Sequence, residues 1–182
     1  MTIRNMRISL LALAVLVAGC SSGTEMKVDS DTVDCERIEA KANLVNCNFS
    51  GMDLTNADFM DADLTGANFT GANLTYATFS SAVAPGVNFS GANLTDSHFT
   101  WADINGANFT GANLTGAFLD RAMAWDTNFT GANLSYAHLN EAQLENANFS
   151  NADLSFADCT DAILIQYAIF TGANLSVSNC EP

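Results

Sequence analysis

The chain of 182 residues carries 20 acidic and 6 basic side chains, which gives a formal net charge of −14. From Ala42 onward Arg121 is the only lysine or arginine. A surface this acidic repels phosphate backbones, which argues against a nucleic-acid partner. The length suits a single domain, and the apolar run at residues 8–17 is too short to cross a bilayer, which takes about 20 residues.

The first segment, residues 1–19, has the composition of an export signal. Arg4 and Arg7 precede the apolar run, as they do in secretory signal peptides. The run ends in the letters VAGC, which resemble the bacterial lipobox, whose cysteine is lipidated and becomes the mature N-terminus. The resemblance implies acylation of Cys20, palmitate included, and hence a membrane anchor; Ser21 implies the outer membrane of a Gram-negative bacterium. The alternative is an ordinary signal peptide followed by an accidental cysteine.

The segment from Cys20 to residue 32 is polar and lacks periodicity, which is typical of a flexible tether. Residues 33–182 then form the predicted domain. Its first stretch, residues 33–41, is expected to cap the domain with one or two turns of helix, begun by Asp31 or Thr32.

From Ala42 the chain repeats every five residues. Each unit reads Ala, Asn or Asp, Leu or Phe, Ser or Thr, and then Gly or a polar residue. A period of five matches neither the 3.6-residue helix nor the two-residue strand, but it fits a chain that turns a corner in every unit. Over residues 42–180 this pattern closely resembles the pentapeptide-repeat family. The resemblance implies an all-β fold, a right-handed quadrilateral β-helix of about seven stacked coils.

In coils of 20 residues, the large apolar centres of the units sort into four columns. The alanine two positions before each centre is expected to point into a narrow core. The residue two positions after each centre is expected to turn a corner, where glycine supplies φ > 0. Leu164 and Phe170 are six residues apart, which predicts a bulge in the last coil. The first column is Phe49, Phe69, Phe89, Phe109, Phe129 and Phe149; the second is Leu54, Leu74, Leu94, Leu114, Leu134 and Leu154; the third is Phe59, Phe79, Phe99, Leu119, Leu139 and Cys159; the fourth is Leu44, Leu64, Ala84, Ile104, Ala124, Leu144 and Leu164.

Four cysteines follow Cys20, and an even number in an exported chain favours disulfides. Cys159 and Cys180 fall in the third column, one coil apart once the inserted residue is counted. Stacked Cα atoms about 4.8 Å apart suit a disulfide. Cys47 points inward in the first coil and Cys35 lies in the cap, so the predicted pairs are Cys35–Cys47 and Cys159–Cys180. Four buried free thiols are the alternative.

Outward positions of the rod are the place to look for a functional surface. Those of the first and second columns are almost uniformly Asn, Ser, Thr and Gly, whereas those of the third and fourth columns are irregular. Pro85 lacks a donor and is expected to interrupt hydrogen bonding between coils. Exposed aromatic side chains and one arginine on an acidic surface are typical interface anchors. The alternative is that scattered exposed apolar residues are normal on a protein surface. The predicted interaction patch is Tyr76, Pro85, Trp101, Phe118, Arg121, Trp125 and Tyr136.

The sequence indicates neither an active site nor a cofactor site. It has no nucleophile–base–acid set, no phosphate loop and no metal-ligand spacing. His98 and His138 share a column but lie two coils apart, roughly 9.6 Å, which is too far for one metal ion. Acidic pairs such as Asp158 and Asp161 would bind calcium weakly at most. The prediction is therefore no enzyme, no cofactor and no metal.

The predicted function is that of a non-enzymatic envelope lipoprotein, whose rigid rod serves as a scaffold or spacer for an unknown envelope protein. The family resemblance also implies a homodimer through the C-terminal coil. The alternative that it offers is an acidic DNA mimic, which would regulate a DNA-binding protein such as a type II topoisomerase. The export signal favours the envelope hypothesis because topoisomerases are cytosolic.

Overall fold

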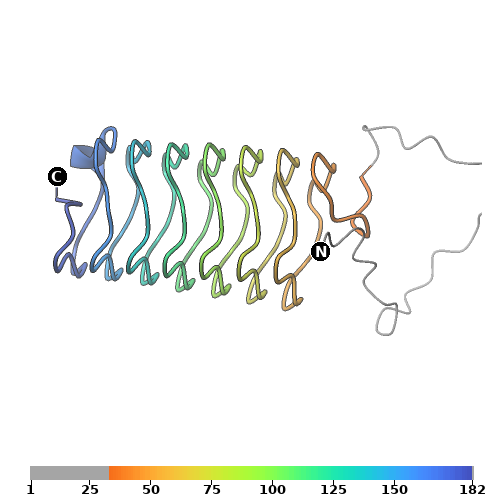
Figure 1. The fold of residues 1–182 in the computed structure, drawn as a ribbon, viewed down its shortest axis with the longest axis horizontal. Helices are drawn as coiled ribbons and strands as arrows, with labels where there is room; N and C mark the ends of the chain where they lie inside the picture. Colours follow the sequence, from red (N-terminus) through yellow and green to blue (C-terminus); the bar gives the residue numbers. More distant parts are fainter. Residues whose placement is uncertain (1–32, 182) are drawn as a thin grey trace, which may run out of the picture.

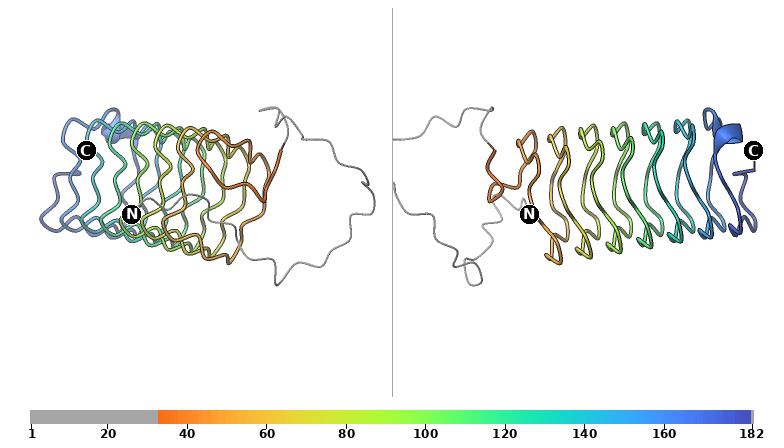
Figure 2. Two further views of the ribbon diagram at one scale, coloured as in Figure 1. Left: turned by 45° about the vertical axis from the view of Figure 1, so that its right-hand side comes forward. Right: turned by 180° about the vertical axis from the view of Figure 1, so that it is seen from behind.

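The computed structural model describes residues 33–181. The predicted signal peptide 1–19, the lipidation site Cys20 and the tether up to residue 32 lie outside this range. Figure 1 shows the described chain as one stack of open coils, which begins near residue 33 and ends at the C-terminus. Two further views show the same coils following one another along a single axis (Figure 2). No helix in residues 33–181 is long and apolar enough to cross a membrane.

Strand pairing consists of isolated parallel bridges that run from Asn43↔Asp63 to Asp153↔Asn174. Until the last coil, each bridge joins a residue to the one 20 positions later. From Asn43 to Asn174, each side of a coil contributes one such residue. The described chain contains no strand with longer bounds. The predicted all-β quadrilateral helix is confirmed.

The backbone repeats one hydrogen-bond pattern in each pentapeptide. The N–H of a column residue donates to a carbonyl of the next coil, as from Phe69 to Asn88 at 2.7 Å. Its own carbonyl accepts from the residue three positions later, as from Ala72 at 3.0 Å, which closes a turn. The corner residue of this turn has positive φ, for instance 64° at Gly71, where glycine avoids the clash of a Cβ. The corners form four lines along the rod, and each is numbered here after the column that precedes it.

The core is built from stacked columns. Within the first column, the rings of Phe89 and Phe109 are stacked with centroids 4.9 Å apart. Phe99 of the third column meets Phe109 edge to face at 5.8 Å, one of the favoured arrangements of aromatic pairs. The alanines between columns are buried as predicted, except in the end coils, where Ala42 and Ala173 are only partly buried. The same inward position holds two buried polar exceptions, Ser97 and Thr127, whose hydroxyls donate to backbone carbonyls at 2.7 and 2.9 Å.

The Asn or Asp before each centre has a local structural role. Its side-chain oxygen accepts the N–H of the residue two positions later, as from Thr70 to Asn68 at 3.1 Å. In a regular unit that N–H takes no part in the backbone bonding between coils. The prediction that Pro85 interrupts this bonding is therefore wrong. The Pro85 carbonyl still accepts from Gly66 at 3.3 Å, and the missing donor would have met the apolar side chain of Val83.

The N-terminal cap contains no helix, so the prediction for residues 33–41 is also wrong. The Asp34 N–H donates to the Asn43 carbonyl at 3.3 Å and the Lys41 N–H donates to the Met60 carbonyl at 2.7 Å. Both contacts draw the cap onto the first coil. Within the cap the Arg37 N–H closes one turn on the Asp34 carbonyl at 3.1 Å, but no helix follows from this turn. A disulfide between Cys35 and Cys47, with Cα atoms 5.5 Å apart, fixes the cap to the first coil.

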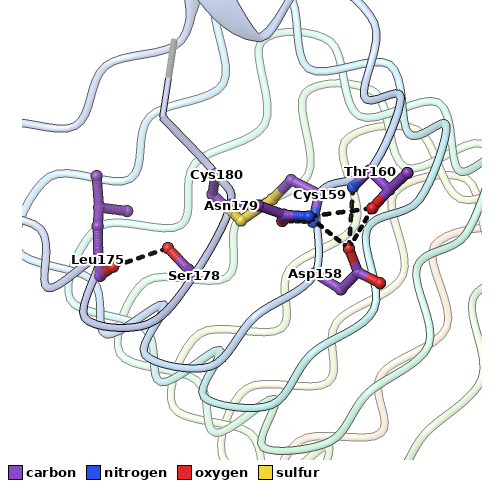
Figure 3. The surroundings of a disulfide bond; sticks show 7 residues. All are labelled: Asp158, Cys159, Thr160, Leu175, Ser178, Asn179 and Cys180. Atoms are coloured by element: carbon purple, nitrogen blue, oxygen red, sulfur yellow. Dashed lines mark hydrogen bonds between the residues drawn. A yellow bond between two sulfur atoms is a disulfide. The ribbon is translucent and has the colours of Figure 1, made fainter.

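The C-terminal end is fixed by the second predicted disulfide, between Cys159 and Cys180, with Cα atoms 5.0 Å apart (Figure 3). Beside it, the side chain of Asn179 donates to Asp158 at 2.9 Å and accepts the N–H of Cys159. The predicted bulge is the 3-10 helix η1, Ile165–Tyr167, where the chain absorbs the additional residue. Beyond it, Asn148 pairs with Ile169, 21 positions later, which restores the register.

Candidate functional site

The structure divides the predicted patch between two sides of the rod. Tyr136 and Tyr76 occupy the second corner and Trp101 and Arg121 the third, with Phe118 on the face between these two corners. The three aromatic corner side chains are 55–57% exposed, whereas Phe118 is half-buried. Pro85 and Trp125 lie on the neighbouring fourth face, two coils apart.

A stack of three rings occupies the centre of the third face. Phe118 lies between His98 and His138, with ring centroids 4.7 and 4.8 Å apart and planes within 4° of parallel. From the sequence we expected only that the two histidines lie too far apart for one metal ion, and the stack was not predicted. The sequence does contain a signal for the stack: Phe118 lies 20 residues from each of the two histidines, so the three rings fall at the same position of successive coils.

This stack replaces a stabilising motif. In a regular unit, each of these three positions would hold an Asn or Asp that accepts the N–H two residues later. His98, Phe118 and His138 forgo that bond. The net contribution of one hydrogen bond to stability is about 0.5–1.5 kcal/mol. Each of three consecutive coils lacks this contribution on the same face.

Bulky side chains at the corners carry a second cost. Tyr76, Trp101 and Tyr136 have φ of 59°, 64° and 60°, a left-handed conformation that costs an L-residue about 1–2 kcal/mol. The first corner of the same rod uses glycine almost throughout, as at Gly111, with φ 64°. The rod therefore holds large side chains at corners where glycine would suffice.

Arg121 joins its neighbours in the third corner. Its Cζ lies 4.9 Å from the ring centroid of Trp101 in the preceding coil. Its Nε and Nη2 donate to the carboxylate of Glu141 in the following coil at 3.0 and 2.7 Å. These hydrogen bonds raise the pKa of Arg121 and lower that of Glu141. The arginine is thus already paired and is not a vacant anion site.

We call this region the third-face patch. It consists of the outward residues of three consecutive coils between the second and third corners, together with the next aromatic side chain of the second corner. Phe156 belongs to it because it stacks on Tyr136 at 4.8 Å. The patch comprises Asp96, His98, Thr100, Trp101, Gly116, Phe118, Asp120, Arg121, Tyr136, His138, Asn140, Glu141 and Phe156.

The fourth-face residues have a different setting. The Trp125 N–H donates to the side chain of Asn105 in the preceding coil at 2.8 Å, which replaces the partner lost where Met123 stands instead of an Asn or Asp. Trp125 is 40% exposed. Neither it nor Pro85 takes part in the network of the third-face patch.

The outward carboxylates act mainly as turn acceptors. The Thr160 hydroxyl donates to Asp158 at 2.7 Å, and this bond, together with one from Asn179, lowers the pKa of Asp158. Bonds from the Ser155 N–H and hydroxyl lower the pKa of Asp153. Within residues 33–181, no three His, Cys, Asp or Glu side chains form a group able to hold a metal ion.

Comparisons with known families agree with this architecture. The family model described as pentapeptide repeat region matches residues 52–124, and that of pentapeptide repeats, eight copies, matches residues 127–166. Together they cover more than half of the sequence, and the chain belongs to the pentapeptide-repeat family. No curated protein sequence matches it significantly.

Several solved structures are similar. A pentapeptide repeat protein from the thylakoid lumen of Arabidopsis thaliana is 35% identical, with a TM-score of 0.53 over 54% of this chain and 69% of that one. HetL, involved in heterocyst differentiation regulation in the cyanobacterium Nostoc, is 26% identical, with a TM-score of 0.49 over 76% of this chain and 85% of its own. QnrB1, a plasmid-mediated fluoroquinolone resistance protein, is 24% identical, with a TM-score of 0.39 over 82% and 80% of the two chains.

Proposed function

We propose that this protein is a non-enzymatic lipoprotein of the bacterial envelope, anchored through Cys20, whose rod presents the third-face patch to a protein partner. The VAGC motif supports the anchor. Disulfides at both ends of the rod support export, because such bonds persist mainly in oxidising compartments. The relative from the thylakoid lumen, also a compartment outside the cytosol, is compatible with export.

Metabolic labelling with a radioactive fatty acid tests the anchor. The wild-type chain should carry label and sediment with membranes, and Cys20→Ala should lose both properties. A Ser21→Ala variant serves as the control and should remain labelled. Unlabelled soluble protein in the cytoplasm would contradict the anchor and favour the acidic DNA-mimic hypothesis.

The binding role depends on one observation: in three consecutive coils the rod forgoes stabilising residues to expose aromatic and imidazole side chains on one face. The first and second faces show what the fold needs structurally. From Asn68 to Ser150 their outward positions hold only Asn, Ser and Thr, with glycine at the corner between them. Aromatic side chains are the common anchors of protein interfaces, so the departure from this pattern supports a binding surface.

Site-specific photocrosslinking in intact cells tests the partner. A photoreactive residue at position 118 should yield a discrete crosslinked species that mass spectrometry can identify. The same residue at Asn113, on the uniform second face of the same coil, is the matched control. Equal crosslinking from both positions, or none from position 118, would contradict a binding role for the third-face patch.

The last coil supports a homodimer as a further proposal. Ile163, Tyr167, Ile169 and Val177 are 47–77% exposed, and Phe170 of the core is only half-buried because no further coil of residues 33–181 covers it. A second copy would cover these apolar groups. Light scattering should show a dimer for the wild-type chain and a monomer for Ile169→Asp; monomeric wild-type protein would exclude this proposal.

A further inference from the structure

The third corner shows how this rod holds a cation. In three consecutive coils it places an aromatic ring, a guanidinium and a carboxylate in line: Trp101, Arg121 and Glu141. The guanidinium carbon is 4.9 Å from the ring centroid, and its nitrogens are 2.7 and 3.0 Å from the carboxylate oxygens. The spacing of the coils therefore suits a cation sandwiched between a ring and a carboxylate two coils apart.

The second corner repeats this arrangement on the same three coils, in reverse order and without the cation. Asp96 supplies the carboxylate, Tyr136 supplies the ring, and Gly116 stands between them. The ladder bonds of the three residues keep them in register, with N–H to carbonyl distances of 3.0 Å for each. The glycine thus leaves a gap at the level where the third corner has Arg121.

Both sides of the gap have a suitable orientation. A Cβ built on Gly116 would collide with Oδ1 of Asp96, so the carboxylate leans toward the gap. Tyr136 is 56% exposed, and Phe156 of the following coil covers one of its faces. Its opposite face is turned toward the coil of Gly116, which has no side chain at that corner.

The dimensions fit a basic side chain. Two coil steps separate Asp96 from Tyr136 by about 9.6 Å, and the lean of the carboxylate shortens the free distance. A guanidinium or ammonium group there would lie over the ring and pair with Asp96, combining a cation–π contact with a charge-assisted hydrogen bond. The net charge of −14 attracts a basic partner. We infer that the gap at Gly116 binds an arginine or lysine side chain of the partner protein.

This inference deepens the proposed function, on which it rests for the protein nature of the partner, but its test is separate. The probe is the peptide acetyl-Gly-Arg-Gly-amide, titrated into the purified full chain and followed by NMR at the Gly116 N–H and the Tyr136 ring. Surface contacts of this kind are weak, so the titration extends to roughly tens of millimolar. Both signals should shift and approach saturation.

The matched control peptide contains citrulline, which keeps the shape of arginine but is neutral, and it should cause no saturable shift. Asp96→Asn and Tyr136→Leu should each weaken binding of the arginyl peptide about three- to fivefold. Tyr136→Phe, which keeps the ring, should bind like the wild-type protein. Asp61→Asn, which removes an exposed carboxylate from the third corner, should also leave binding unchanged.

Three results would overturn binding of a basic side chain at the gap at Gly116. The first is no saturable shift with the arginyl peptide, and the second is equal binding of the citrulline peptide. The third is equal weakening by Asp61→Asn and Asp96→Asn, which would indicate general attraction to an acidic rod. Each would leave the photocrosslinking result at position 118 unaffected. Failure of the inference about the gap at Gly116 is therefore distinguishable from failure of the proposed binding role.

Discussion

The guanidinium of Arg121 lies over the indole ring of Trp101, with Cζ 4.9 Å from the ring centroid. The two residues are 20 positions apart and meet only because the coils stack in register. The same register brings Glu141 to the other side of the guanidinium. Contacts of this kind, between outward residues of successive coils, determine the chemistry of the surface.

The ion pair predicts a pH-dependent contribution to stability. Hydrogen bonds from Arg121 lower the pKa of Glu141, so the folded state binds this proton less readily than the unfolded state. The contribution is present above the unfolded carboxyl pKa and is lost as pH falls through the folded value. The difference in free energy of unfolding between wild type and Glu141→Gln should therefore shrink from about pH 7 to about pH 3. A difference that stays constant would contradict the pair.

The left-handed corners predict that bulky side chains there reduce the stability of the rod. Tyr76→Gly should leave the free energy of unfolding unchanged or raise it by about 1 kcal/mol, because it relieves a backbone with φ of 59°. The reciprocal change Gly111→Tyr, at φ 64°, should destabilise by about 1–2 kcal/mol. Denaturant unfolding measures both. If Tyr76→Gly proved strongly destabilising, Tyr76 would be a structural residue.

Two phenylalanines in similar stacks should respond differently to truncation. Phe109 is fully buried in the first column, whereas Phe156 is 48% exposed at a corner. Phe109→Ala should cost about 3–5 kcal/mol. Phe156→Ala should lose only the aromatic pair with Tyr136, about 0.5–1.5 kcal/mol. Similar losses in chemical unfolding would contradict the assignment of Phe156 to the surface.

The C-terminal disulfide should protect the last coil. Replacing Cys159 and Cys180 together by alanine should cost about 2–4 kcal/mol and speed hydrogen exchange mainly in residues 163–180. The Cys35–Cys47 pair gives the matched control, since its loss should affect the opposite end of the rod. Intact mass before and after reduction checks that both bonds form; the absence of a 4 Da change would show that they do not.

The columns and the disulfides followed from the sequence because the fold is locally encoded. Each unit carries its own centre, inward alanine and corner residue, so the position in the period determines which side chains point inward. Cys159 and Cys180 could be paired from this register alone. The additional residue before Phe170 was visible for the same reason, as a break in the period.

The prediction of a capping helix was wrong because the backbone groups of the cap can bond either within a helix or to the open edge of the first coil. The backbone of Asp34 and Lys41 bonds to that edge, and the bridge to Cys47 holds it there. Pro85 was misjudged because the sequence does not reveal which backbone N–H groups bond between coils. The one that proline lacks belongs to a bond within the turn.

The sequence by itself determined the architecture of this protein: a five-residue period sorts residues into core, corner and surface, since each unit repeats the same local turn. The tertiary structure alone decided which outward side chains meet. The stack of His98, Phe118 and His138, the sandwich around Arg121 and the gap at Gly116 depend on rotamers and on a coil spacing near 5 Å. Residues 20 apart come within contact distance only after the coils have stacked.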